Sequence, residues 1–167
     1  MRFYGLALLA SAAVLGACGG GENKTADTTK APPASTANPA TPSTPAAGAV
    51  APVAATGATH EIKMIGDDKG YRFDPADITI KSGDAVKFTV VSGGPHNVAF
   101  DPATVPTDSK AQLNANMPNE MSELSSPMLM NANESYTISF GGVKPGAYPF
   151  HCTPHLAMGM KGTITVQ

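Results

Sequence analysis

Apolar and polar residues alternate with a period of two in several short stretches between residues 60 and 167. The apolar members of these stretches are Ile78 and Ile80; Val86, Phe88 and Val90; Tyr136, Ile138 and Phe140; Tyr148, Phe150 and Cys152; and Ile164 and Val166. Successive side chains of a strand point to opposite faces, so this pattern predicts half-buried β-strands. Turn sequences separate the stretches, namely SGD at 82–84, SGGP at 92–95 and KPG at 144–146. Short strands with regular turns favour a β-sandwich or barrel, and we predict a mainly β fold.

Residues 101–133 interrupt this pattern, because their apolar positions follow neither the strand period nor the helix period. We expect an irregular or short-helical insertion here, with helical turns near Ser109–Ala115 and Glu120–Leu124.

The chain before residue 60 has the composition of a leader followed by a tether. Arg2 precedes an apolar run from Phe3 to Leu15, which is a signal-peptide layout too short and too alanine-rich for a membrane span. The sequence LGAC at 15–18 resembles the bacterial lipobox, in which the chain is cut before the cysteine and that cysteine is lipidated. An ordinary signal peptide with a chance cysteine is the alternative. Residues 19–59 consist mostly of Ala, Thr, Pro, Ser and Gly, and their lack of aromatic residues predicts a disordered tether.

We therefore divide the chain into a signal peptide (1–17), a lipidated Cys18 with its tether (18–59) and one domain (60–167). Several acyl chains on Cys18 would anchor an exported bacterial lipoprotein that faces the periplasm or the cell exterior. Gly19, in place of an acidic residue, favours the outer membrane if the cell is Gram-negative. The 11 Lys and Arg against 13 Asp and Glu give a net charge of −2, with no basic patch to indicate nucleic-acid binding. A monomer is expected.

Cys152 needs an explanation, because with Cys18 assigned to lipid it has no disulfide partner in an oxidising compartment. Such a thiol can bridge a dimer, lie buried as an inert apolar group, act as a nucleophile or bind a metal. Its neighbours favour the metal, since His155 and two methionines follow it and His96 lies upstream in GPHNV. A thiolate, two imidazoles and a weak thioether suit copper that cycles between Cu(II) and Cu(I).

Residues 60–167 resemble the type 1 blue copper proteins of the plastocyanin, pseudoazurin and amicyanin group. The motifs that carry the resemblance are SGDAVKF at 82–88, GGPHNVAFD at 93–101, PGAYPFHCTPH at 145–155 and MKGTITV at 160–166. The resemblance implies a Greek-key cupredoxin β-sandwich with one copper ion at one end, held by His96, Cys152, His155 and a following methionine. It also implies that Asn97 braces the cysteine loop by hydrogen bonding near Thr153.

Two methionines compete for the fourth ligand position. Met160 lies at the plastocyanin and pseudoazurin spacing from His155, and Met158 at the shorter amicyanin spacing. In these relatives the ligand methionine is followed by one residue and then usually directly by the closing strand, here KGTITV at 161–166. The comparison favours Met160 and leaves Met158 in the loop, with Gly159 between them as a flexible joint.

The remaining residues are given surface or packing roles. His151 points to the opposite face of its strand from Cys152 and is expected in a surface or second layer, while His60 is expected to be solvated. Residues 156–158 would form an apolar rim around the exposed edge of His155, where unidentified redox partner proteins dock.

Segment 101–133 departs from the family, since its amino-acid sequence is not typical of these proteins. Its methionines are Met117, Met121, Met128 and Met130. They can be gap-filling core residues or a soft loop that collects Cu(I), and we favour packing or plain exposure.

The sequence favours a tethered electron-transfer protein with a mononuclear copper site. The alternative is a periplasmic copper storage or delivery protein, which would release the metal readily to chelators instead of showing a reversible one-electron couple. An enzyme is not expected, because a copper oxidase or nitrite reductase needs further histidine-rich centres that the sequence does not provide.

Overall fold

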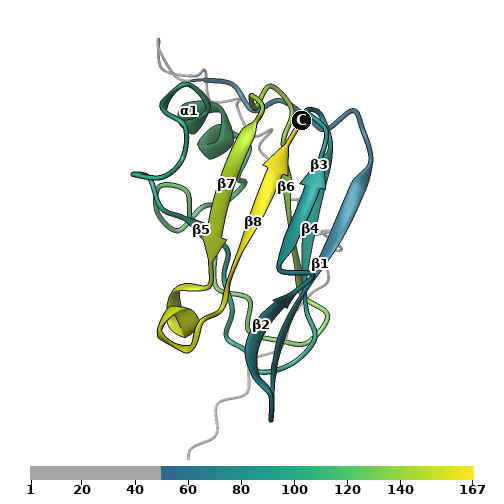
Figure 1. The fold of residues 1–167 in the computed structure, drawn as a ribbon, viewed down its shortest axis with the longest axis vertical. Coiled ribbons are helices and arrows are strands. Elements are labelled where there is room, and N and C mark those ends of the chain that lie inside the picture. The colour runs from purple at the N-terminus through teal and green to yellow at the C-terminus, as the bar shows by residue number, and fades with distance from the viewer. Residues whose placement is uncertain (1–49) are drawn as a thin grey trace, which may run out of the picture. The chain divides into compact units, whose positions relative to one another are not determined.

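The computed structural model describes residues 50–167, so the predicted signal peptide, Cys18 and most of the predicted tether lie outside the described residues. Two four-stranded sheets, with the orders β2-β1-β4-β6 and β3-β8-β7-β5, form the fold (Figure 1). The elements are β1 (Thr59–Asp67), β2 (Gly70–Asp74), β3 (Asp77–Ile80), β4 (Ala85–Val90), β5 (Ala99–Phe100), α1 (Thr107–Ala115), β6 (Ser135–Ser139), β7 (Gly146–His151), the 3-10 helix η1 (Thr153–Met158) and β8 (Lys161–Val166).

Both sheets mix parallel and antiparallel pairs. In the first sheet β1 runs parallel to β4 and antiparallel to β2, and in the second β3 runs parallel to β8 while β7 runs antiparallel to it. The prediction of a mainly β sandwich with little helix is confirmed.

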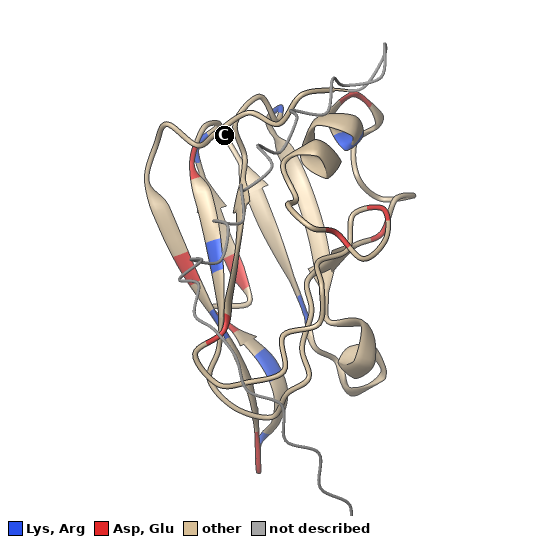
Figure 2. Cartoon of the chain, turned by 180° about the vertical axis from the view of Figure 1, so that it is seen from behind, with Lys and Arg blue, Asp and Glu red and all other residues tan. Residues whose placement is uncertain are grey.

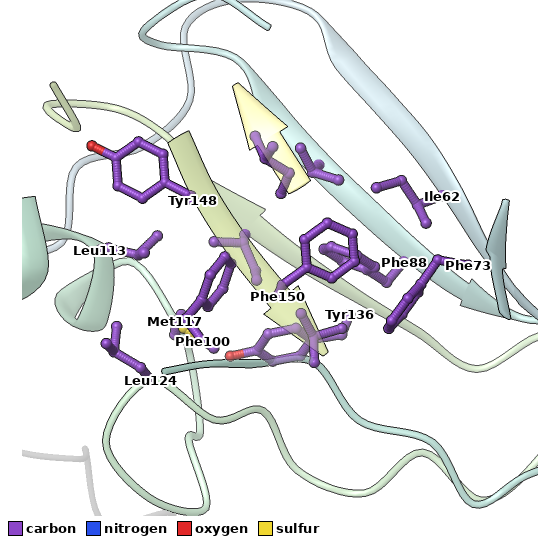
Figure 3. Packing of buried hydrophobic residues seen from close by; sticks show 14 of the residues in the cluster. Ile62, Phe73, Phe88, Phe100, Leu113, Met117, Leu124, Tyr136, Tyr148 and Phe150 are labelled. Atoms are coloured by element: carbon purple, nitrogen blue, oxygen red, sulfur yellow. The ribbon is translucent and has the colours of Figure 1, made fainter. Parts of the chain in front are cut away.

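The alternating apolar residues meet between the two sheets. Phe150 of β7 lies at the centre, with ring centroids 4.7 Å from Phe73 of β2 and 5.4 Å from Phe88 of β4 (Figure 3). Both contacts are edge-to-face, an arrangement that adds about 0.5–1.5 kcal/mol per pair beyond the burial of area. These rings bind the two sheets together beneath the loops that follow β4 and β7.

The segment 101–133 contains one helix and a tight turn. The helix α1 covers the predicted turn at 109–115 and buries Leu113 in the core. The second predicted helical turn, at 120–124, is wrong. Leu124 takes a positive φ of 57° there, its N–H donates to Asn114 Oδ1 at 2.7 Å, and Ser125 N–H closes a turn onto Ser122 O. The buried Leu124 side chain and its captured N–H hold this conformation against the helical one.

The described chain begins with a segment that packs on the domain ahead of β1, and we call residues 50–58 the strap. Val53 N–H donates to Asn116 Oδ1 at 2.8 Å, and Val53 O accepts Ser139 Oγ–H at 2.7 Å. Thr56 and Gly57 both donate their N–H groups to Gly83 O at 2.9 Å. Residues 50–58, which the sequence assigned to the tether, are therefore hydrogen-bonded to the domain.

Asp84 continues this attachment at the start of β4. Its carboxylate accepts the N–H groups of Ala58 at 2.8 Å and Lys81 at 3.0 Å, and it pairs with His60 Nε2 at 2.8 Å. The sequence led us to expect a solvated His60, but its ring is hydrogen-bonded to Asp84.

Charged residues of both signs are scattered over strands and loops in the part of the chain seen in Figure 2. Within residues 50–167, no helix combines the length and the apolar character that crossing a bilayer requires.

Candidate metal centre

His96, Cys152 and His155 come together at one end of the sandwich, and their donor atoms all lie within 4.8 Å of one another. The Sγ atom of Cys152 lies 3.6 Å from His96 Nδ1 and 3.4 Å from His155 Nδ1. The cysteine and His96 are fully buried, and His155 is 7% exposed. The three residues that the sequence singled out as ligands therefore form one buried cluster.

The spacing of Cys152 and His155 follows from the local backbone. Strand β7 ends at His151, and Cys152 is still extended, with φ −98° and ψ 115°. Pro154 then lies in the first turn of η1, where its fixed φ suits a helix start. A 3-10 helix has three residues per turn, so side chains three positions apart point the same way. His155 N–H bonds to Cys152 O at 3.1 Å and closes this turn.

His96 lies in the connection between β4 and β5, paired with Leu129 by backbone hydrogen bonds of 3.0 and 2.8 Å. Its ring Nε2 lies 2.8 Å from Ser92 O. A carbonyl oxygen only accepts, so Nε2 carries the hydrogen and Nδ1 presents its lone pair to the cluster. Such a bond on the far ring nitrogen is the usual way in which a metal-binding histidine is oriented.

Met160 and Met158 lie in opposite environments. Met160 is fully buried, and Met158 is 61% exposed. The backbone of Met160 is tied to the cluster loop, since its carbonyl accepts Cys152 N–H at 3.1 Å and its N–H donates to His155 O at 3.2 Å. Gly159, with a φ of 85°, turns the chain between the two methionines.

Asn97 connects the two loops that form the cluster. Its backbone N–H points at Cys152 Sγ at 3.5 Å, and its side chain bonds both Thr153 and the Ser125 hydroxyl. A hydrogen bond to the sulfur and a braced loop are two means by which surrounding groups tune a metal thiolate.

In the metal-free protein the surroundings of Cys152 and His155 favour the neutral forms of these two groups. Burial raises the pKa of the Cys152 thiol above its ordinary 9.0, although hydrogen bonds from the backbone of Asn97 and His155 oppose the rise. Burial, followed by the electrostatic influence of the neighbouring His96, lowers the pKa of His155. A metal that binds the Cys152 thiolate must therefore displace the thiol proton.

The other residues considered from the sequence lie apart from the cluster. His151 is half-buried and faces a groove on the outer side of β7, and it is not among the clustered donors of residues 50–167. Met117 is buried in the core, while Met121 and Met130 are exposed. The methionines of segment 101–133 therefore have no common environment.

Tyr71 is the contact that sequence reasoning missed. Its ring stacks on His155 with centroids 3.7 Å apart and an interplanar angle of 12°. This cover and the low exposure of the imidazole differ from the expectation of an open His155 edge, although Leu156 and Met158 beside it are exposed as a rim. Tyr71 lies far from the cysteine loop in sequence, and no motif marks it.

Two imidazole nitrogens and a thiol that converge in a buried site form a donor set suited to copper. A family model described as copper binding proteins, plastocyanin/azurin family, matches residues 60–167. The chain belongs to this family. The protein is accordingly a copper-binding electron-transfer protein with a cupredoxin fold. The matched range spans segment 101–133, although the sequence of that segment is not typical of the family.

Individual relatives of this blue copper protein are plastocyanins. The chain is 40% identical over 111 residues to plastocyanin of Nostoc punctiforme, covering 65% of this chain and 74% of that protein. It is 35% identical over 107 residues to plastocyanin A/B of Petroselinum crispum, covering 64% of this chain and 98% of that one. A solved structure of a mutant plastocyanin of fern aligns at 35% identity with a TM-score of 0.49, covering 64% of this chain and 99% of that chain.

Proposed function

We propose that this protein carries single electrons by means of one type 1 copper ion held by His96, Cys152, His155 and Met160. The observation that carries the proposal is the convergence of two Nδ1 atoms on the buried Cys152 sulfur, at 3.6 and 3.4 Å. Copper supplies the one-electron couple, and the protein supplies a mixed donor set that serves both oxidation states.

The surroundings of the cluster support electron transfer over metal delivery. Ser92 O fixes His96, and Asn97 ties the loop of His96 to the loop of Cys152. A site braced in this way needs little movement when its charge changes, which favours fast electron transfer. A delivery protein has to open to release its metal.

Partner proteins would dock where the cluster comes nearest to the surface. Leu156 and Met158 are exposed on η1 directly beside His155. An apolar, nearly uncharged rim of this kind suits brief contacts with other redox proteins, because it can be desolvated at low cost.

The visible spectrum and voltammogram of the copper-loaded protein test the proposal. The Cu(II) form is expected to be intensely blue from thiolate-to-copper charge transfer, with a reversible one-electron couple. Cys152→Ser should abolish the colour even if copper still binds, and His151→Ala, which alters the neighbouring residue outside the cluster, should keep it. A colourless Cu(II) form of the unaltered protein would refute the type 1 site. Rapid loss of copper to a chelator without a reversible couple would favour storage or delivery.

We further propose that the protein is an exported lipoprotein anchored through Cys18, with residues 1–17 as its signal peptide. The support is the LGAC sequence at 15–18 after the apolar run. Cys18→Ala should move the protein out of the detergent phase in partitioning experiments. Membrane partition of that variant, together with an unmodified wild-type cysteine, would contradict the anchor.

A further inference from the structure

The two histidines of the cluster are held in different ways. His96 has the Ser92 carbonyl on its Nε2, whereas within residues 50–167 no hydrogen bond reaches Nε2 of His155. His155 also lies on a short 3-10 helix whose neighbouring side chains, Leu156 and Met158, are exposed. The plane of this imidazole is therefore not fixed by a hydrogen bond on its far ring nitrogen, as that of His96 is.

The ring of Tyr71 lies flat on that plane. The two centroids are 3.7 Å apart at an angle of 12°, whereas the two histidine rings meet edge-on, with centroids 5.0 Å apart and an angle of 63°. Tyr71 comes from β2, on the sheet opposite the strand that leads to the cysteine. The contact therefore joins the β1–β2 hairpin to η1 across the end of the sandwich.

Gly66 makes room for the Tyr71 ring, and Gly93 lets the following loop approach Gly66 closely. Gly66 is the cross-strand partner of Tyr71, and a Cβ added to Gly66 would lie 2.6 Å from Tyr71 Cε1. Gly93, with a φ of 75°, comes so close that its own Cβ would lie 2.4 Å from Gly66 Cα. Gly66 N–H then donates to Ser92 O at 2.9 Å, the same carbonyl that orients His96. The hairpin thus reaches one histidine through Ser92 and the other through Tyr71.

We propose that Tyr71 is a positioning residue for His155, whose ring it holds in the orientation that directs Nδ1 at the Cys152 sulfur. It takes the place of the hydrogen bond that usually fixes a metal-binding histidine. The effect expected in the copper-loaded protein rests on the proposed copper site. The effect expected in the metal-free protein rests only on the stacking of Tyr71 on His155.

The size of the effect follows from the usual strength of aromatic pairs. Such a pair contributes about 0.5–1.5 kcal/mol beyond its buried area, which corresponds to about a 2- to 10-fold change in a population or a rate. The aromatic face and not the hydroxyl makes the contact, since no hydrogen bond of Tyr71 Oη is found within residues 50–167. Tyr71→Phe should therefore behave like wild type.

Ring dynamics in the metal-free protein provide the first test. We would compare the wild type, Tyr71→Leu and Tyr71→Phe by NMR relaxation dispersion of the His155 ring carbons. Phe73→Leu is the matched control, because Phe73 lies two residues along β2 from Tyr71 but packs on Phe88 and Phe150 in the core. We expect exchange between ring orientations only in Tyr71→Leu. Tyr71→Met would replace that variant if it did not fold.

Release of copper from the Cu(I)-loaded protein provides the second test. Transfer to bathocuproine disulfonate should be about 2- to 10-fold faster in Tyr71→Leu than in wild type, with Tyr71→Phe and Phe73→Leu close to wild type. An unaltered His155 ring in Tyr71→Leu, or a Tyr71→Phe variant as mobile as Tyr71→Leu, would overturn the proposal. If neither the wild type nor any variant bound copper, the proposed function would fail. The measurement on the metal-free protein would still decide the role of Tyr71.

Discussion

The Asn97 side chain binds Thr153 with both of its polar atoms. Its Oδ1 accepts the Thr153 N–H at 2.7 Å, and its Nδ2 donates to Thr153 Oγ1 at 3.1 Å. Asn97 follows His96 directly and Thr153 follows Cys152 directly. Because each of the two residues is the direct neighbour of a cluster residue, the pair holds the His96 imidazole and the Cys152 sulfur at a fixed distance.

Removal of this connection should affect both stability and the copper site. Asn97→Ala deletes the two bonds to Thr153 and a third to Ser125, so we expect a loss of roughly 1–3 kcal/mol in the free energy of unfolding. Urea unfolding of the metal-free protein measures this loss. Ser125→Ala, which removes only one of the bonds, should cost less. An Asn97→Ala variant with unchanged stability and an unchanged Cu(II) spectrum would show that the connection is not needed.

The choice between the two methionines can be tested by voltammetry. Met160→Leu should raise the reduction potential markedly, because it removes a weak donor to Cu(II), while Met158→Leu should change it little. Leucine and methionine have similar volumes, so the folding cost at the buried Met160 should stay below about 1.5 kcal/mol. If Met158→Leu carried the effect, the ligand loop would follow the shorter spacing and the assignment of Met160 would be wrong.

Asp84 should make the stability of the domain depend on pH in the acidic range. Its pKa is held below the ordinary 3.8, first by the Lys81 N–H and then by His60 and Ala58. A carboxylate whose pKa is lowered by folding stabilises the protein above its unfolded pKa, and this contribution disappears as the pH falls through the folded value. Asp84→Asn should therefore lower the Tm above about pH 5, and the difference from wild type should shrink as the pH falls toward about 3. A difference that stays constant over this range would contradict the assignment.

Asn116 should control the attachment of the strap. Its buried side chain accepts Val53 N–H and donates to the carbonyls of Ser139 and Gly141. Asn116→Ala should leave these groups without partners, cost roughly 1–3 kcal/mol and remove the hydrogen-exchange protection of the Val53 amide. Gln112→Ala, which removes bonds to the Ala51 carbonyl and to Asn116 Oδ1 but leaves the Asn116 side chain in place, serves as the control. Continued protection of Val53 in Asn116→Ala would show that the strap is held elsewhere.

The strands could be predicted because their apolar residues repeat along the sequence. Val86, Phe88 and Val90 alternate in the chain and all lie buried on the inner face of β4. The cluster of His96, Cys152 and His155 could be anticipated for a related reason. Two of its members are three residues apart, and that spacing matches one turn of the helix that joins them.

The remaining features depend on contacts that leave no mark on the sequence. The strap has the composition of a linker, and its partners, which include Asn116, Ser139 and Gly83, lie far along the chain. Tyr71 could be recognised only from its place opposite Gly66, since the register of the hairpin determines which side chain faces His155. The tight turn at Leu124 depends on an N–H captured by Asn114, a local bond that outweighs helix propensity.

The strap is attached at one end of the sandwich, and this position determines where a force on the preceding chain acts. Its bonds lie near α1 and the C-terminus, whereas η1 lies at the other end of the sandwich (Figure 1). A force applied through the chain before residue 50 would act on this end and would be borne by the hydrogen bonds to Asn116, Ser139 and Gly83. The histidine and cysteine loops lie outside that line of load. With the proposed anchor at Cys18, the end of the domain that carries His96 and Cys152 would therefore lie opposite the end at which the chain enters the domain.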